Sequence, residues 1–433
     1  MNTIYALSSG KPPSGVAVFR VSGPQSRFVL ETISGLVPSP RMATLRKLRF
    51  PDSSEIVDTG LCFWFPGPES FTGEDSAEFH LHGGPAVVQA MLKALSDIDG
   101  LRLAEAGEFS RRAFENGKLD LTEVEGLADL IVAETEMQRR QAVAQAGGVM
   151  REQLENWRER IVRMRAMVEA SFDFAEEEDI PGGVEDGVWA QAAELAREIK
   201  AALDNGRHGE IVRDGFQIVL LGSPNAGKSS LLNALARRDV AIVTSEAGTT
   251  RDLIEVHLDI DGYAVTIVDT AGMRETEGQV ENEGIRRAKE RAGLADLVLW
   301  LWPAAEEELP AEAEPYLKDG LLLRSKDDEG VFGDDGVSVV RENGMEALLE
   351  AIRSRLDKHA NHGEFALITR GRHRSLLQDC TKSLDEASSD HTLAIEIRSE
   401  KLRESGDLIG LLTGRIETDH LLDVIFKEFC VGK

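Results

Sequence analysis

Cysteine is scarce in this chain, with three residues among 433. Cys62, Cys380 and Cys430 are too few and too widely spaced for a disulfide framework or a zinc site. No apolar run approaches the roughly 20 residues that a membrane-spanning helix needs. The first residues, MNTIYALSSGKPPSG, lack a basic segment followed by an apolar one, so no signal peptide is predicted. We therefore expect a cytoplasmic protein without a membrane partner.

Positive charge is also in the minority. Lys and Arg number 49 against 76 Asp and Glu, which gives a formal net charge of −27. Because phosphate is repelled by a negative surface, this balance argues against strong sequence-independent binding of nucleic acid. Such binding would need a local basic patch, for which Arg111-Arg112 and Arg139-Arg140 are candidates, or a basic partner. Hydrophobic residues make up 42% of the chain, which is enough for packed cores and excludes wholesale disorder.

Hydrophobic patterning divides the chain into segments of different character. Short apolar or alternating runs predict strands at 15–21, 61–65, 77–82, 217–221, 263–268 and 297–301. Apolar residues at helical spacing predict helices at 86–95, 121–131, 138–168 and 188–203, with a charged Gly/Pro-rich loop at 175–183. Strands and helices alternate from Phe216 to about Asp357, and the chain is helical again from about Thr369. This order predicts a doubly wound α/β domain inserted into a helical domain.

A phosphate-binding loop follows the strand at 217–221. Residues 222–229, GSPNAGKS, match the full G-x-x-x-x-G-K-[ST] pattern, and a helix-like run from Ser230 to Ala236 comes next. Glycines allow successive backbone N–H groups to turn inward and, with the helix N-terminus, to surround an anion. We expect Lys228 to reach the β- and γ-phosphates and Ser229 to bind Mg²⁺.

Two further segments fit a nucleoside triphosphate site. Asp269-Thr270-Ala271-Gly272 follows the strand at 263–268, where the Asp can hold the magnesium shell and Gly272 can offer its N–H to the γ-phosphate. Residues 248–252, GTTRD, supply a threonine that can complete the magnesium shell. Each pattern alone is also common in ordinary turns and surface loops, and only their company with the phosphate-binding loop makes them specific.

Guanine selection is predicted at residues 325–328, Ser-Lys-Asp-Asp, where GTPases usually carry N-K-x-D. Asp328 can accept both N–H donors of guanine, a pair that adenine does not offer, and Lys326 would lie over the base. Ser325 replaces the usual Asn, so one orienting hydrogen bond is expected to be weaker, by about 0.5–1.5 kcal/mol.

The sequence resembles the tRNA-modifying GTPase family MnmE, also called TrmE. The resemblance covers nearly the whole chain. Around the nucleotide motifs it includes 224–233, PNAGKSSLLN, and 248–252, GTTRD. Outside them it rests on segments that other GTPases lack, namely 71–75 (FTGED), 107–110 (GEFS), 116–122 (NGKLDLT) and 429–433 (FCVGK).

The resemblance implies a multidomain α+β and α/β protein. It places a folate-binding-like, dimerising N-terminal domain at 1–118, a helical domain at 119–214 and 358–433, and an inserted Ras-like G domain at 215–357. It also implies a homodimer that joins the flavoprotein MnmG (GidA) in a heterotetramer. The complex would modify carbon 5 of the tRNA wobble uridine with a one-carbon unit from formyl- or methylene-tetrahydrofolate, FAD, and glycine or ammonium. GTP hydrolysis would control its conformation.

Site residues also follow from the resemblance. The GTP-binding set is Asn225, Ala226, Gly227, Lys228, Ser229, Ser230, Thr244, Ser245, Glu246, Ala247, Gly248, Thr249, Thr250, Asp269, Thr270, Ala271, Gly272, Lys326 and Asp328. Mg²⁺ would be bound by Ser229 and Thr250, and K⁺ by Asn225, Thr244, Glu246 and Thr249. The catalytic residues would be Lys228, Thr250 and Glu281, which orients the attacking water. Folate would contact Arg20, Glu78, Lys118 and Lys433.

Several alternatives stay open from the sequence alone. Arg20, Glu78 and Lys118 can equally be ordinary ion-pairing residues. His80 and His82 lack an evident third metal ligand, and Cys430 can be packed in the tail rather than act as a nucleophile. The main rival function is a regulatory ribosome-assembly GTPase. A membrane-remodelling GTPase is a third option, although no basic amphipathic segment is evident. Neither has use for the folate-like segment or the terminal FCVGK.

Overall fold

The structure is a computed structural model, and it describes residues 2–173, 184–223, 225–238, 240–242, 254–269, 291–306, 308–316, 318–358, 366–390, 392–416, 419–427, 429, 431 and 432. The chain forms two compact units. The first comprises Met1–Ala128, Met150–Asn156 and Ile409–Lys433, and the second comprises Asp129–Val149 and Trp157–Leu408.

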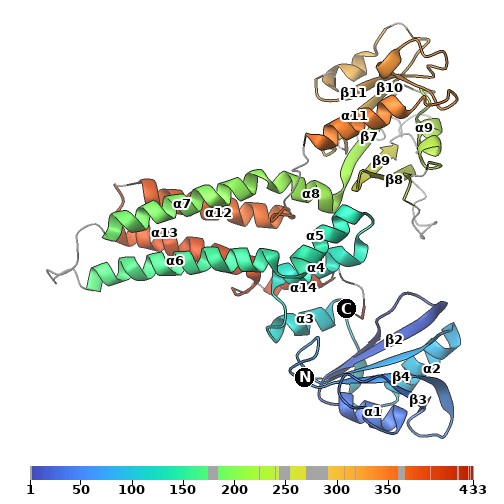
Figure 1. Ribbon diagram of the computed structural model, residues 1–433, viewed down its shortest axis with the longest axis vertical. Helices are drawn as coiled ribbons and strands as arrows, with labels where there is room; N and C mark the ends of the chain where they lie inside the picture. The colour runs from blue at the N-terminus through green and yellow to red at the C-terminus, as the bar shows by residue number, and fades with distance from the viewer. Residues whose placement is uncertain are drawn as a thin grey trace, which may run out of the picture. The chain divides into compact units, whose positions relative to one another are not determined.

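A six-stranded sheet organises the first unit (Figure 1). Its strands are β1 (Thr3–Leu7), β2 (Ser14–Ser22), β3 (Thr44–Arg49), β4 (Ile56–Phe65), β5 (Ser76–Gly83) and β6 (Leu101–Leu103), in the order β3-β4-β5-β2-β1-β6. All neighbours are antiparallel except β1 and β6. Helices α1 (Ser26–Ser34) and α2 (Pro85–Ser96) pack on one face, against buried residues such as Phe19, Phe79 and Leu81. Because strand side chains alternate, Arg20, Glu78 and His80 lie on the opposite face.

A small helical cluster completes the first unit. It contains α3 (Glu108–Glu115), α4 (Leu121–Val132) and α14 (Asp419–Lys427), with Leu121, Val124, Leu422 and Phe426 in its core. The C-terminal segment returns to the start of the chain, since Val431 bridges Ala106 and the Ser8 hydroxyl donates to the Gly432 carbonyl at 2.9 Å. The last described residue is therefore held beside the end of β1.

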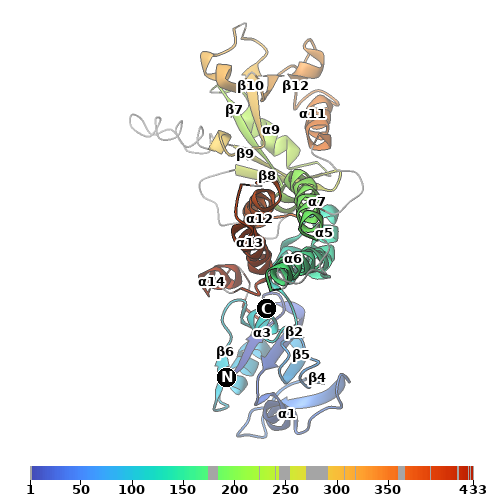
Figure 2. The ribbon, with the colours of Figure 1, turned by 90° about the vertical axis from the view of Figure 1, so that its left-hand side faces the viewer.

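Long helices make up much of the second unit. The unit contains α5 (Glu136–Ala146), α7 (Val184–Asp204), α8 (Gly206–Asp214) and α12 (Gly371–Ser389). It also contains most of α6 (Val149–Asp173) and of α13 (Ile395–Thr413), of which residues 150–156 and 409–413 belong to the first unit. Helix α7 lies beside α12 (Figures 1 and 2). Its buried residues Val188, Ala192, Leu195 and Ile199 recur at three- and four-residue intervals, as expected for one apolar helix face.

The second unit also contains a six-stranded doubly wound sheet of order β12-β11-β10-β7-β9-β8. Its elements are β7 (Phe216–Gly222), α9 (Lys228–Leu235), β8 (Ile254–Ile260), β9 (Tyr263–Asp269), β10 (Leu297–Pro303), η1 (Ala311–Tyr316), β11 (Leu321–Ser325), η2 (Gly333–Asp335), β12 (Gly336–Val337) and α11 (Glu346–Asp357). Only β8 pairs antiparallel to its neighbour among these described strands.

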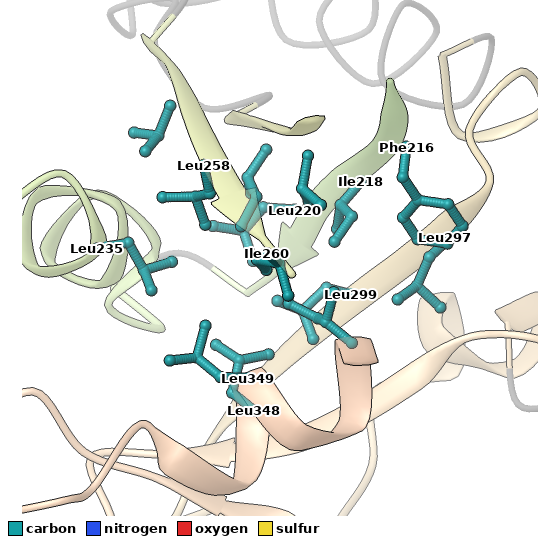
Figure 3. Close-up of a cluster of buried hydrophobic side chains, with 14 of the residues drawn as sticks. Phe216, Ile218, Leu220, Leu235, Leu258, Ile260, Leu297, Leu299, Leu348 and Leu349 are labelled. Atoms are coloured by element: carbon teal, nitrogen blue, oxygen red, sulfur yellow. The ribbon is translucent and has the colours of Figure 1, made fainter. Parts of the chain in front are cut away.

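The core of this sheet follows the alternation of its central strands. Phe216, Ile218 and Leu220 of β7 face one side, where Leu235 of α9 and Leu348 of α11 pack against them (Figure 3). Val219 and Leu221 face the other side, against Ala292 and Ala313. Both faces of β7 are thus covered, which explains its apolar run at 218–221.

The predicted fold class is confirmed. The six predicted strands and the predicted helices at 86–95, 121–131 and 188–203 lie within observed elements, with the strand at 61–65 forming the end of the longer β4. The single helical region predicted at 138–168 is instead divided into α5 and α6 by Gly147 and Gly148, where Gly148 has a positive φ of 89. The predicted loop at 175–183 lies outside the described residues. Strands β1, β3, β6, β8 and β12 were not predicted. Among the helices that the structure describes, none is long and apolar enough to cross a membrane.

Candidate nucleotide and folate sites

The phosphate-binding loop connects β7 to α9. Gly222 ends β7 with φ +147, and a Cβ there would lie 2.3 Å from the Leu301 carbonyl oxygen of β10. Gly227 precedes α9 with φ +88, and Asn225 also has a positive φ, of 61. Such backbone angles strongly favour Gly and tolerate Asn, which accounts for these residue types in the loop. The N–H groups of the first turn of α9 are left for an anion.

Lys228 turns back over this loop. Its Nζ donates hydrogen bonds to the carbonyl oxygens of Gly222 at 2.8 Å and Ser223 at 3.1 Å. Burial lowers the pKa of Lys228, while the negative charge of Asp269 raises it, and burial prevails. The ammonium group is therefore held in a poorly solvated position, where a phosphate would be a stronger acceptor than a carbonyl.

Ser229 and Asp269 meet although 40 residues separate them. The Ser229 hydroxyl donates to Oδ2 of Asp269 at 3.1 Å, and Asp269 is fully buried at the end of β9. Strand pairing causes this meeting, because β9 lies beside β7 with Asp269 opposite Leu220. A hydroxyl and a carboxylate are oxygen ligands of the kind that Mg²⁺ prefers, so the residues present fit that ion.

The segment predicted to recognise guanine, residues 325–328, lies next to the phosphate-binding loop. Lys326 has φ 60, and its Cε lies 3.9 Å from the point where a Cβ on Gly227 would stand. Oδ1 of Asp328 accepts a hydrogen bond from the Ser338 hydroxyl at 2.5 Å. Ser338 was not predicted, because it follows a two-residue strand too short to show a pattern.

Part of the predicted nucleotide site lies outside the described residues. This applies to Thr244, Ser245, Glu246, Ala247, Gly248, Thr249, Thr250, Thr270, Ala271, Gly272 and Glu281. Their roles stay predictions. The structure brings Ser229 and Asp269 into contact, holds Lys228 on the carbonyl oxygens of the preceding loop, and places Lys326 beside Gly227.

A second cluster lies on the open face of the first unit's sheet. Arg20 of β2 pairs with Glu78 of β5, and Nε of Arg20 lies 3.0 Å from Oε1 of Glu78. His80 approaches the other carboxylate oxygen, with 3.2 Å between its Nε2 and Oε2. The guanidinium lies 5.2 Å from the ring centre of Phe71 and 5.8 Å from that of Phe109. Burial would raise the pKa of Glu78, but its bonds to His80 and Arg20 outweigh burial and lower it.

The other predicted folate residues are less completely placed. Lys118 is half-buried after α3, where its N–H donates to the Ala113 carbonyl at 2.8 Å. Lys433 lies outside the described residues. Phe71 and Phe109 were not predicted as part of this cluster, and the signal was weak, since each merely belongs to a family-like segment. His82 binds a different carboxylate, Asp58, with 3.0 Å between Nδ1 and Oδ2, so the two histidines do not share a partner.

Two family models match the chain. The MnmE helical domain matches residues 121–430, and the GTP-binding protein TrmE N-terminus matches residues 3–118. The chain is 49% identical over 435 residues to a tRNA modification GTPase MnmE of Rhizobium etli (strain CIAT 652), covering 100% of this chain and 99% of the relative. It is also 49% identical over 441 residues to the tRNA modification GTPase MnmE of Mesorhizobium japonicum (strain LMG 29417), covering 100% and 99%.

Similarity to solved structures is weaker. Aquifex aeolicus Era is 23% identical with a TM-score of 0.26, over 39% of this chain and 66% of that one. A TM-score this low supports no statement about the sites. The two family models together match nearly the whole chain, and the relative from Rhizobium etli matches it over its full length. The chain therefore belongs to the MnmE family of tRNA modification GTPases.

Proposed function

We propose that this protein hydrolyses GTP and acts with a flavoprotein partner in modifying the wobble uridine of tRNA. The observation that carries the proposal is the joint position of Lys228, Ser229 and Asp269 around the loop after β7, in a chain that matches the family along its whole length. The family resemblance indicates tRNA as the substrate class, and the residues of the loop indicate hydrolysis of GTP.

The nucleotide would be held by the chain's own groups. Backbone N–H groups at the start of α9 and the ammonium of Lys228 would bind the β- and γ-phosphates. Ser229, with Thr250, would hold Mg²⁺, and Asp269 would fix the orientation of the Ser229 hydroxyl. Bound Mg²⁺ neutralises negative charge that develops on the phosphate oxygens. Asp328 would accept the two N–H donors of guanine.

Hydrolysis also requires a cation near the bridging oxygen between the β- and γ-phosphates. Asn225 is exposed, and its positive φ marks a sharp turn of the loop. An amide oxygen on such a turn fits K⁺, together with Thr244, Glu246 and Thr249. Pairing of two G domains in the homodimer would complete this cation site, and Glu281 would orient the attacking water.

The cluster around Arg20 supports the folate part of the proposal. A tetrahydrofolate derivative combines a flat ring system with an anionic glutamate tail. Arg20 supplies positive charge, and Phe71 supplies a 38% exposed aromatic ring beside it. Lys118 and Lys433 would add further positive charge. Glu78 holds the Arg20 guanidinium in place through their 3.0 Å contact. The one-carbon unit of formyl- or methylene-tetrahydrofolate would come from this site.

Transfer RNA would be bound largely by the MnmG partner. A net charge of −27 repels RNA, and the basic cluster Arg111-Arg112 is already paired with carboxylates. Arg111 contacts Glu115 at 3.0 Å and Asp423 at 2.9 Å, and Arg112 contacts Glu74 at 2.8 Å and Glu108 at 3.0 Å. We expect the isolated protein to bind tRNA much more weakly than the complex does at physiological salt.

Mass analysis of wobble nucleosides tests the main proposal. Cells that lack the protein should lose the carbon-5 modification, and wild type should restore it while Lys228→Ala should not. Lys318→Ala, which changes an exposed lysine of the same unit, serves as the control and should restore it fully. Unchanged nucleosides in the deleted cells would contradict the proposal and favour a regulatory ribosome-assembly GTPase.

A titration with formyl-tetrahydrofolate tests the cofactor. The wild type should show a saturable site, and Arg20→Ala should weaken it by about tenfold or more, since it removes a charge-assisted contact. Lys47→Ala, on the exposed edge strand β3, should bind like the wild type. Absence of a saturable site on the wild-type protein would refute folate binding.

A further inference from the structure

The guanine-recognition segment lacks the anchor expected at its first position. Ser325 stands where N-K-x-D carries Asn, and it is 4% exposed. Its hydroxyl has no hydrogen-bond partner among the residues that the structure describes. A serine side chain is one bond shorter than that of asparagine and has no amide group. The side chain at position 325 therefore does not tie this segment to its surroundings, and another group must do so.

Asp327, two residues later, is bound from several directions. It is 2% exposed. Its Oδ1 accepts the N–H of Val331 at 2.8 Å, and Oδ2 accepts the N–H of Phe332 at 3.3 Å. Its own N–H donates to the Val337 carbonyl at 3.2 Å, and its carbonyl accepts from Gly330 at the same distance.

The neighbours of Asp327 leave space for this carboxylate and little else. A Cβ on Gly336 would stand 2.1 Å from Oδ2 of Asp327, so the carboxylate occupies the space above that glycine of β12. Nη1 of Arg341 lies 3.8 Å from the same oxygen and supplies an opposite charge. A carboxylate that accepts backbone N–H groups beside a cation forms charge-assisted bonds, which are stronger than neutral ones.

Asp328 directly follows this fixed residue. Its Oδ1 accepts the Ser338 hydroxyl, and the oxygen of that hydroxyl accepts the N–H groups of Val340 at 3.1 Å and Arg341 at 3.0 Å. Asp327 and Asp328 thus bind to one short stretch of chain, residues 336–341.

We propose that Asp327 is the positioning residue for guanine recognition in this protein, in place of the side chain at position 325. Its buried carboxylate fixes the turn at 328–332 against β12 and so aims Asp328 at the base. This inference rests on the proposed GTP-binding function. It adds a residue outside the N-K-x-D positions that contact the nucleotide.

The test compares binding of GDP and inosine diphosphate to the full-length protein by calorimetry. Inosine lacks the exocyclic amino group of guanine, so it makes one bond fewer to Asp328. If Asp327 aims Asp328, Asp327→Asn should weaken GDP binding by about tenfold and inosine diphosphate binding much less, so that the affinity ratio falls by about fivefold. A purely structural role would weaken both nucleotides equally.

Ser325→Ala is the matched control. Because the Ser325 hydroxyl has no partner in the described part of the chain, both affinities should stay within about twofold of wild type. An equal loss for both nucleotides in Asp327→Asn, or no loss, would overturn the inference. So would a fall in the ratio for Ser325→Ala as large as that for Asp327→Asn.

Arg341→Ala decides the question if Asp327→Asn fails to fold. It leaves the carboxylate and removes its neighbouring charge, so the ratio should fall by about two- to threefold, and an unchanged ratio would overturn the inference. Failure of the proposed function is distinguishable. A wild-type protein that binds neither nucleotide would overturn both proposals, whereas guanine preference that is unaffected by these variants would overturn this inference alone.

Discussion

The ammonium nitrogen of Lys228 lies 2.8 Å from the carbonyl oxygen of Gly222, six residues earlier in the same loop. The Lys228 side chain thus folds back over the loop that precedes it. Burial lowers the pKa of this lysine, although Asp269 acts in the opposite direction. A bound triphosphate would replace the two carbonyl oxygens as the hydrogen-bond acceptor of Lys228, since a charged acceptor forms the stronger bond.

Replacing Lys228 should therefore reduce GTP hydrolysis without lowering the thermal stability of the protein. Lys228→Ala should reduce GTP hydrolysis by about 100-fold or more, because it removes a charge that stabilises the transferring phosphate. The melting temperature without nucleotide should not fall, since a buried charge is costly to keep. Hydrolysis assays and thermal unfolding measure the two effects. Near-normal hydrolysis in a folded variant would contradict the assigned role.

The monovalent cation can be tested with salts alone. We expect GTP hydrolysis to be at least about tenfold faster in potassium chloride than in sodium chloride at equal ionic strength, because the smaller ion does not fit the same oxygen ligands. Asn225→Ala should remove most of this difference, as the proposed K⁺ site includes the side-chain oxygen of Asn225. Equal wild-type rates in the two salts would eliminate this mechanism.

The nucleotide-binding sheet was predictable because its central strands are covered on both faces. Such strands contain continuous apolar runs, as in residues 218–221, IVLL. The motif spacing also predicted that Ser229 and Asp269 act together, and parallel pairing of β7 with β9 brings them within 3.1 Å. Strand β3 was missed because most residues of TLRKLR are polar. Strand β8 was missed although IEVHLDI alternates apolar and polar residues, as a half-buried strand does.

The remaining parts of both sites depend on contacts between distant segments. Phe71 precedes β5 and Phe109 begins α3, yet both rings lie within 6 Å of the Arg20 guanidinium. No periodic pattern in the sequence links positions 20, 71 and 109. Asp327 is similar, because its partners at 331, 332 and 341 are set by a loop conformation and not by a repeat. Tertiary packing alone selects these residues.

The pair of Arg20 and Glu78 should produce a pH-dependent contribution to stability. The pKa of Glu78 is lowered in the folded state, so its carboxylate stabilises the fold above its unfolded pKa of about 4.3. That contribution is lost as the pH falls through the lower folded pKa. The free-energy difference of unfolding between wild type and Glu78→Gln should thus be present at neutral pH and shrink in acid. Urea unfolding across this range measures it, and a difference independent of pH would contradict the assignment.

Two thiols should be protected from alkylation in the native protein. Burial raises the pKa of Cys62 to about 11 and that of Cys380 to about 12. Because only the thiolate reacts, both should stay unmodified by iodoacetamide near pH 8 until the protein is unfolded. Peptide mapping before and after unfolding provides the measurement.

The third cysteine, Cys430, lies outside the described residues. We expect Cys430→Ser to keep full GTP hydrolysis, because the nucleotide site contains none of the three cysteines. Rapid native labelling of Cys62 or Cys380 would contradict their burial. Loss of hydrolysis in Cys430→Ser would contradict a passive role for the tail cysteine in the GTPase reaction.

Two helical glycines should respond in opposite directions to the same substitution. A Cβ on Gly209 of α8 would stand 2.2 Å from the Ile368 carbonyl oxygen and 2.7 Å from Cβ of Ala366, so Gly209→Ala must push backbone apart. We expect a loss of about 2–4 kcal/mol in the free energy of unfolding. A Cβ on Gly187 of α7 would meet nothing within 4 Å. Gly187→Ala should then stabilise the helix by about 0.5–1 kcal/mol.

Urea unfolding followed by tryptophan fluorescence can rank the two variants against wild type. Trp157 and Trp189 are buried in the same unit as both glycines, so their emission reports its unfolding. The midpoint should move down for Gly209→Ala and up for Gly187→Ala. Equal midpoints would mean that α8 moves away from residues 366–368 at little cost, and the close packing described for that helix would then be wrong.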